Sequence, residues 1–147
     1  MLEVRDFVAK DFLGIMPRPE ESFSEGEREF IAEKLEVLSA VGRTIHEDGH
    51  VIFVCGFAPL NRSTAEVWWF GGPEVVGRGR EIYRITRELL EHHAVRLKFH
   101  RVQATVQESF LVAVKFIERL GFHLESPMPR FGPNQETFLR YARFFDD

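Results

Sequence analysis

The sequence is poor in the features that cross-link a chain or send it to a membrane. Cys55 is the only cysteine among 147 residues, so an intramolecular disulfide is excluded and a reducing compartment is expected. It lies in the apolar run 51–57, where we interpret it as a small buried hydrophobic residue. The first residues lack the basic-then-apolar pattern of a signal peptide, and no apolar run reaches the length of a membrane span. We therefore predict a cytoplasmic protein without a membrane partner.

Concentrated charge is also missing. The chain has 19 Lys and Arg against 23 Asp and Glu, a net charge of −4 and no long basic block, which argues against a nucleic-acid surface. His92 and His93 are adjacent rather than one helical turn apart, so we predict no metal site. The length and the 44% of hydrophobic residues indicate one globular domain spanning 1–147.

Hydrophobic periodicity predicts an α/β fold with a sheet of mixed direction, in the order β-α-β-β-β-α-β-α-β. The helix that begins at Glu25 places Phe30, Ile31, Leu35 and Leu38 at helical spacing. Turn signals stand at 14–24, 47–50 and 59–63. Strands are expected at 2–5, 43–46, 51–57, 66–70, 97–102 and 138–144. Helices are expected near Asp11, from Glu25 to before Gly42, and from the glycine loop to His92-His93. A last helix is expected at 113–120, with Gly121 as its C-terminal glycine.

A glycine-rich loop joins the strand ending in Phe70 to the following helix, over residues 71–79. Free N–H groups and the dipole at a helix start favour an anion such as pyrophosphate, and glycine allows the backbone to approach it. A Walker loop is excluded because Gly79 is followed by Arg80 and Glu81, and the three glycines of the Rossmann pattern are also missing. The loop therefore indicates a nucleotide-bearing cofactor, although any tight strand-to-helix turn can also recruit glycine.

This order of elements, with a glycine loop after the fourth strand, resembles the GNAT superfamily of N-acetyltransferases. The opening 4–11, the pair Pro73-Glu74 and the run 118–122 are similar to the family's common phrases. The resemblance implies a six- to seven-stranded mixed sheet flanked by helices, and acetyl-CoA as cofactor. It also implies an N-acyltransferase that moves an acetyl group to a primary amine, on a small molecule or peptide, by direct attack, and it allows a homodimer.

The resemblance also assigns the cofactor site. The family loop reads Gln or Arg, two residues, Gly, one residue, Gly or Ala, so matching Gly77 and Gly79 places Glu74 at the basic position. A carboxylate there has the wrong sign for pyrophosphate, and Arg78 or Arg80 would have to supply the positive charge. A register shifted by two places Val76 at the basic position and Glu81 at the final glycine, so each register has a departure. The implied cofactor-binding residues are Trp69, Phe70, Val75, Val76, Gly77, Arg78, Gly79 and Arg80.

The catalytic residues of the family are only partly matched. The position of its usual general acid, a Tyr, holds Ile117, and an Asn position in the same helix holds Phe110; neither side chain can donate a proton. Ser109 could act through a water, or could cap the helix. We therefore expect slow transfer, because general acid catalysis contributes about 10²–10⁴-fold. The ionisable candidates for a general base are Glu66, His46, His50 and His100, each also a plausible surface residue, and Glu66 and Ser109 are the two catalytic candidates.

A narrower resemblance offers an alternative. GNAT-like proteins of tailed bacteriophages, of the internal virion protein A type, are similar in their Trp-rich fourth strand, the polar helix after it and an aliphatic residue in place of the Tyr. A catalytically degenerate phage or prophage virion protein, or a binding protein of this fold, is the second hypothesis, because a fold does not guarantee an activity.

Overall fold

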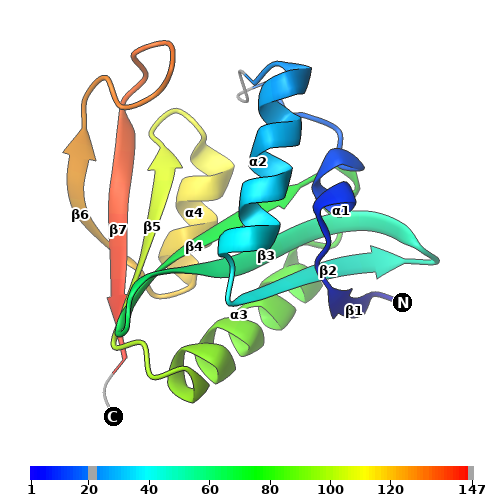
Figure 1. Cartoon of the computed structure of the whole chain (residues 1–147), viewed down its shortest axis with the longest axis horizontal. Helices are drawn as coiled ribbons and strands as arrows, with labels where there is room; N and C mark the ends of the chain where they lie inside the picture. Colours follow the sequence, from blue (N-terminus) through cyan, green and yellow to red (C-terminus); the bar gives the residue numbers. More distant parts are fainter. Residues whose placement is uncertain (20–22, 146–147) are drawn as a thin grey trace. The chain divides into compact units, whose positions relative to one another are not determined.

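The sequence forms an α/β fold, as predicted. Within residues 1–19 and 23–145, which the computed structural model describes, helices flank a mixed sheet of seven strands in the order β1-β2-β3-β4-β5-β7-β6 (Figure 1). The strands are β1 Glu3–Asp6, β2 Val41–Glu47, β3 His50–Asn61, β4 Thr64–Gly71, β5 Arg101–Gln107, β6 His123–Met128 and β7 Phe138–Phe144. The helices are α1 Ala9–Leu13, α2 Glu25–Leu38, α3 Gly79–Arg96 and α4 Leu111–Arg119, with a 3-10 helix η1 at Pro73–Val75.

The residues group into two compact units. Unit 1 holds Met1–Ala58 and Trp68–Thr86, and unit 2 holds Pro59–Val67 and the residues from Arg87 onward. The elements β3, β4 and α3 therefore each contribute residues to both units.

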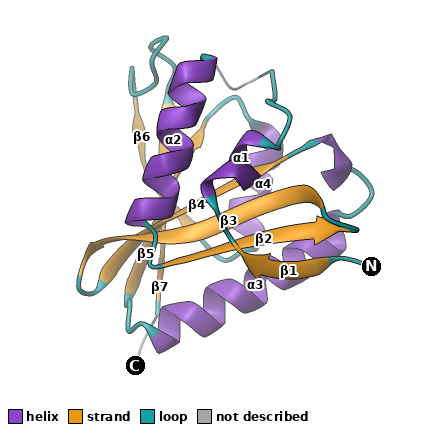
Figure 2. Ribbon diagram, turned by 45° about the vertical axis from the view of Figure 1, so that its right-hand side comes forward, coloured by secondary structure: helices purple, strands orange, loops and turns teal. Residues whose placement is uncertain are grey.

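Aromatic side chains build the core of unit 1. In this unit α1 and α2 lie on the same face of the β2–β3 ribbon (Figure 1 and Figure 2). Phe7 contacts Trp68 edge to face with ring centroids 5.0 Å apart, and Phe12 contacts Phe70 at 4.7 Å. Such aromatic pairs add about 0.5–1.5 kcal/mol beyond the burial of their area. The buried cluster comprises Phe7, Phe12, Ile15, Ala32, Val54 and Trp68.

A buried carboxylate ties β1, α1 and β2 together. Arg5 donates to both oxygens of Asp11 at 2.8 Å, Thr44 donates at 2.8 Å and the Val8 N–H at 3.1 Å. Burial opposes ionisation of Asp11, but these donors outweigh it and hold its pKa below the usual value. Asp11 thus opens α1, as its position in the sequence predicts.

The hairpin predicted at 47–50 is confirmed. Asp48 and Gly49 both have positive φ, 51° and 80°, as the two-residue turn that matches strand twist requires. The pairing of β2 with β3 shifts by a bulge between Ile45 and His46, which increases the local twist.

The buried face of α2 does not follow its apolar residues. Phe30 and Leu38 are 61% and 57% exposed, whereas Arg28 and Ala32 are buried. Arg28 donates to the carbonyl oxygens of Phe12 (3.1 Å), in the last turn of α1, and of Ile15 (2.8 Å), just after that helix. Satisfying these carbonyls turns the basic side chain of α2 inward and leaves Phe30 outside.

In unit 2, β7 pairs antiparallel with β5 and β6, and the start of β4 pairs parallel with β5. One face of this sheet is apolar and packs toward α4. Tyr141 on β7 donates to Glu118 of α4 at 2.9 Å, and its burial raises the pKa of the phenol to about 12. The buried residues of this face include Val102, Ala104, Val106, Leu139 and Tyr141.

Several element boundaries differ from the expectation. β3 continues through Pro59 to Asn61, β6 was not expected, and α3 runs past His92-His93 to Arg96. Lys98, rather than a glycine, takes the left-handed conformation after α3 (φ 60°), and the Phe99 N–H bonds the Ala94 carbonyl. This helix cap occupies part of the stretch predicted as a strand, so β5 begins at Arg101.

Candidate functional site

The loop between β4 and α3 lies in unit 1 and is built by glycines of two kinds. A Cβ added at Gly72 would lie 2.6 Å from the Glu74 carboxylate, so this glycine serves the turn itself. Gly77 has φ +86°, and a Cβ at Gly77 or Gly79 would meet no atom within 4 Å. The backbone at these two positions therefore faces open space, where a ligand could approach it.

The start of α3 leaves hydrogen-bond donors available. The first turn closes with the bond from the Ile82 N–H to the Arg78 carbonyl (3.0 Å). Among the contacts of the described residues, none uses the N–H groups of Gly79, Arg80 or Glu81, as expected for a helix N-terminus without a side-chain cap. These amides, with the helix dipole, fit a pyrophosphate group.

Arg78, a sequence-predicted ligand, is held by protein groups. Its guanidinium donates to the Glu74 carbonyl at 3.0 Å and to the Glu47 carboxylate at 2.5 Å. Glu47 also accepts from the Met1 ammonium at 2.9 Å, and the two donors lower its pKa. The cation left exposed in the first turn of α3 is Arg80. The sequence pattern did not identify Glu47 as a site residue, because its position predicts only a hairpin turn.

Glu74, whose charge opposes an anion, is also paired. Its carboxylate lies 2.5 Å from Nε2 of His50, and this hydrogen bond lowers the pKa of Glu74. The pair engages a candidate base, His50, in a hydrogen bond beside the loop. Glu47 and Glu74, beside the loop, thus both have partners within unit 1.

The other predicted cofactor residues differ in accessibility. Trp69 and Val75 are half-buried and Val76 is 81% exposed. Phe70 is half-buried and packs its ring on Phe12. Arg18, from the 14–24 loop, donates to the carbonyl of Gly71 at 3.3 Å and so positions the end of β4.

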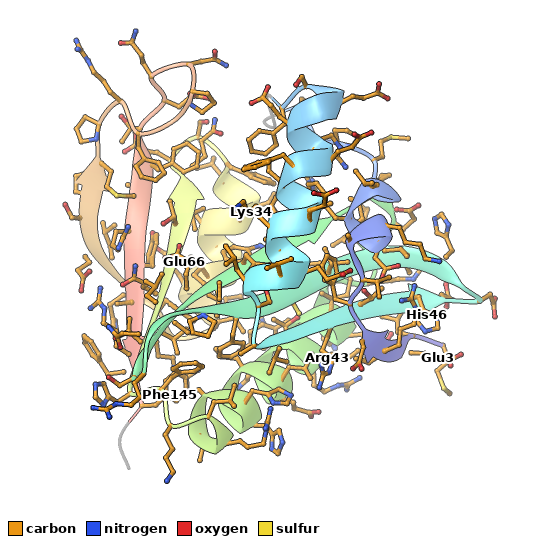
Figure 3. The ribbon with its side chains drawn as sticks, viewed as in Figure 1. Glu3, Lys34, Arg43, His46, Glu66 and Phe145 are labelled. Carbon is orange, nitrogen blue, oxygen red and sulfur yellow. The ribbon has the colours of Figure 1, made fainter. Side chains whose placement is uncertain are left out.

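Glu66, the predicted base, lies in unit 2 on β4 (Figure 3). Its carboxylate accepts from Gln103 Nε2 at 3.0 Å and Thr105 Oγ1 at 2.9 Å. Both donors come from β5, whose alternating polar residues are the sequence signal that was overlooked. The parallel pairing ends at Glu66 and Gln103, although both strands continue. The two donors fix the orientation of the carboxylate.

The proposed acid positions around α4 offer little chemistry. Ser109 is exposed and its Oγ accepts from Gln107 Nε2 at 2.9 Å. It does not cap α4, because the N-cap is Phe110 and no side-chain cap bond is made there. Ile117 is fully buried, so it is a core residue of unit 2.

The remaining histidine candidates are His46 and His100. His46 is half-buried on β2, with Nδ1 buried and unpaired among the described contacts, and His100 is exposed before β5. No group of three or more His, Cys, Asp or Glu residues suited to a metal ion occurs in 1–19 and 23–145. Among the helices of the same residues, none combines the length and apolar character needed to span a membrane.

Comparison with known proteins gives a result at the level of structure. No family model and no curated protein matches the sequence. A GNAT-family acetyltransferase from Bacillus anthracis is 19% identical, with a TM-score of 0.73, over 97% of this chain and 94% of that chain. YncA from Salmonella typhimurium, solved with acetyl-CoA, is 17% identical with a TM-score of 0.70, over 100% and 95%. A spermidine N-acetyltransferase chimera of Vibrio cholerae and human sequences is 19% identical with a TM-score of 0.73, over 97% and 95%.

The chain has the GNAT fold. The structural likeness covers nearly the whole chain, as the resemblance in sequence pattern implied. In this chain the loop and the start of α3 stand after the fourth strand, where the sequence pattern placed the pyrophosphate loop.

Proposed function

We propose that this protein is an acetyl-CoA-dependent N-acyltransferase that acetylates a primary amine. The observation that carries the proposal is the start of α3, where unpaired amides and two glycines open to space follow β4 in a GNAT fold. YncA, which shares this fold, is solved with acetyl-CoA. The amides of 77–81 would hold the pyrophosphate, Arg80 would add charge, and the backbone of 67–70 would bind the pantetheine arm.

The reaction needs an amine that has lost its proton beside an activated acyl group. Acetyl-CoA supplies the acetyl group as a thioester, whose thiolate is a good leaving group near neutral pH. Glu66, held by Gln103 and Thr105, would accept the ammonium proton directly or through a water. Binding and orientation contribute the rest, since Ile117 provides no acid.

The test is an acceptor screen with acetyl-CoA. Polyamines, amino acids, peptides and aminoglycosides are incubated with the protein, and free thiol and acetylated product are measured together. We expect slow acetylation of at least one class, reduced about 10²-fold or more in Glu66→Gln. The exposed Glu29→Gln on α2 is the matched control. Acetyl-CoA binding without any acetylated product contradicts the enzyme proposal.

The buried Ile117 favours one second candidate. A GNAT-fold protein without its proton donor could serve as a binding protein, including a phage or prophage virion component. In that case acetyl-CoA turnover stays at the background rate with every acceptor.

A further inference from the structure

The face of the unit 2 sheet that lies opposite α4 is polar, and one of its cations lacks a counter-charge. We call it the polar face; its members include Arg101, Gln103 and Thr105 of β5 and Arg140 of β7. These β5 residues alternate with the buried Val102, Ala104 and Val106, and Arg140 is directly opposite Thr105. Directly opposite residues project to the same side of a sheet. Glu66 joins this face through its bonds to Gln103 and Thr105.

The arginines of this sheet differ in their partners. Arg101 makes two bonds of 2.7 Å to Glu125. Arg143, on the other face, bonds Glu91 and the Leu120 carbonyl at 2.8 Å each. Arg140 has no carboxylate within ion-pair distance among the described residues, and its one hydrogen bond goes to the thioether sulfur of Met128 at 3.8 Å.

The burial around Arg140 makes the absence of a carboxylate partner energetically costly. The guanidinium is half-buried, and its Nε is buried without any acceptor among the described atoms. Unpaired buried polar groups are rare in folded proteins, and a charged one carries a larger penalty than a neutral one. The positive charge of Arg140 helps to lower the pKa of the nearby Glu125. Both carboxylate oxygens of Glu125, however, accept hydrogen bonds from Arg101. A planar guanidinium with free N–H groups matches the two oxygens of an oxyacid anion.

We propose that Arg140 binds an anionic oxyacid group, a carboxylate or a phosphate, on the acceptor substrate. This inference rests on the proposed acyltransferase function, with the amine at Glu66, and it names the acceptor class as an amine that carries a remote anion. The assignment combines the unpaired guanidinium with its place on the same face as Glu66.

Sheet geometry sets the spacing of the two groups. Glu66 aligns with Gln103 on β5, and Arg140 aligns with Thr105 on β5. The two residues are therefore two inter-strand spacings apart across the sheet and two residues apart along it, roughly 12 Å at 4.7–4.9 Å per spacing and about 3.3 Å per residue. An extended chain covers about 3.3–3.6 Å per residue, so an acceptor about three to four residues long reaches both groups and a free α-amino acid does not.

Binding is tested without acetyl-CoA, so that the result is independent of transfer. The protein, labelled with 15N arginine, is titrated with triglycine, triglycinamide and inorganic phosphate, and the Arg140 Nε–H signal is assigned by its loss in Arg140→Gln. We expect triglycine to shift this signal and triglycinamide to leave it in place. The phosphate titration distinguishes a carboxylate from a phosphate as the anion on the acceptor. A larger shift of the Arg140 signal with phosphate than with triglycine indicates a phosphate-bearing acceptor. No shift with triglycine or phosphate, or equal shifts with triglycine and triglycinamide, overturns the proposal.

Kinetics with acetyl-CoA then test the substrate class. We expect kcat/KM for triglycine to exceed that for triglycinamide about tenfold or more, and this ratio to fall to near one in Arg140→Gln, with partial recovery in Arg140→Lys. Arg62→Gln, in the exposed turn after β3, is the control and should keep the ratio. Acetylation of both peptides with equal kcat/KM contradicts anion recognition. An Arg140 shift without acetylation of any amine leaves the anion site standing and contradicts the acyltransferase function.

Discussion

The guanidinium of Arg78 donates to the carboxylate of Glu47, 31 positions earlier in the chain. The sequence pattern assigns Arg78 to the cofactor, but in the structure Arg78 pairs with the carboxylate of Glu47 beside the loop. It leaves Arg80 as the exposed cation at the start of α3. The electrostatics of the candidate site therefore depend on a pair that no local motif contains.

The pair predicts a rescue experiment. Arg78→Gln should weaken coenzyme A binding about threefold, because it leaves the Glu47 charge less compensated near a helix N-terminus. Arg78→Gln combined with Glu47→Gln should restore the affinity, whereas Glu47→Gln should not rescue Arg80→Gln. Titration calorimetry measures all four proteins. If the combined variant binds no better than Arg78→Gln, Arg78 contacts the cofactor itself.

Ile117 yields a prediction about stability. Because its side chain is fully buried, Ile117→Tyr should lower the free energy of unfolding by about 1–3 kcal/mol through overpacking and a buried hydroxyl. Ile117→Val, the smaller change, should cost about 0.5–1.5 kcal/mol. Urea denaturation compares the two variants. A Tyr variant of wild-type stability that also raises turnover would show that this position opens toward the reacting groups.

Asp11 predicts a pH dependence. Its folded pKa lies below the usual 3.8, so its contribution is present above the unfolded pKa and is lost as pH falls through the folded pKa. Asp11→Asn should therefore cost about 2 kcal/mol at neutral pH, and the difference from wild type should shrink below about pH 4. Asp48→Asn, in an exposed turn, should show no such trend. Denaturant curves recorded across pH 2–7 provide the test, and a pH-independent difference would contradict it.

Local chemistry explains which parts of the fold could be predicted from sequence. The turn at Asp48-Gly49 and the last strand, Phe138–Phe144, depend on residues within a few positions of one another. β6 was missed because its residues are nearly all exposed and include Ser126-Pro127, so no alternation marks it. The end of α3 was misplaced because Lys98 forms the left-handed cap that a glycine usually announces.

The candidate site shows the same difference between features set by local sequence and features set by distant contacts. The glycine loop and the helix after it follow from a contiguous pattern, and Glu66 was chosen for its chemistry on the fourth strand. The partners that decide charge and access come from distant positions: Glu47 for Arg78, Gln103 and Thr105 for Glu66, and Phe12 for Phe70. The spacing of residues within each segment does not show which distant residues become partners.

Calorimetric titration of acetyl-CoA into the wild-type protein and into Gly79→Val tests the central claim most directly. A Cβ at Gly79 meets no protein atom within 4 Å, so the variant should fold, while its side chain fills the space that the pyrophosphate would need. Gly26→Val, at an equally open glycine of α2, is the matched control. We predict binding tighter than about 1 mM in the wild type and Gly26→Val, and no measurable binding in Gly79→Val. Absence of binding to the wild type, or equal affinity in Gly79→Val, would contradict the assignment of this loop to acetyl-CoA.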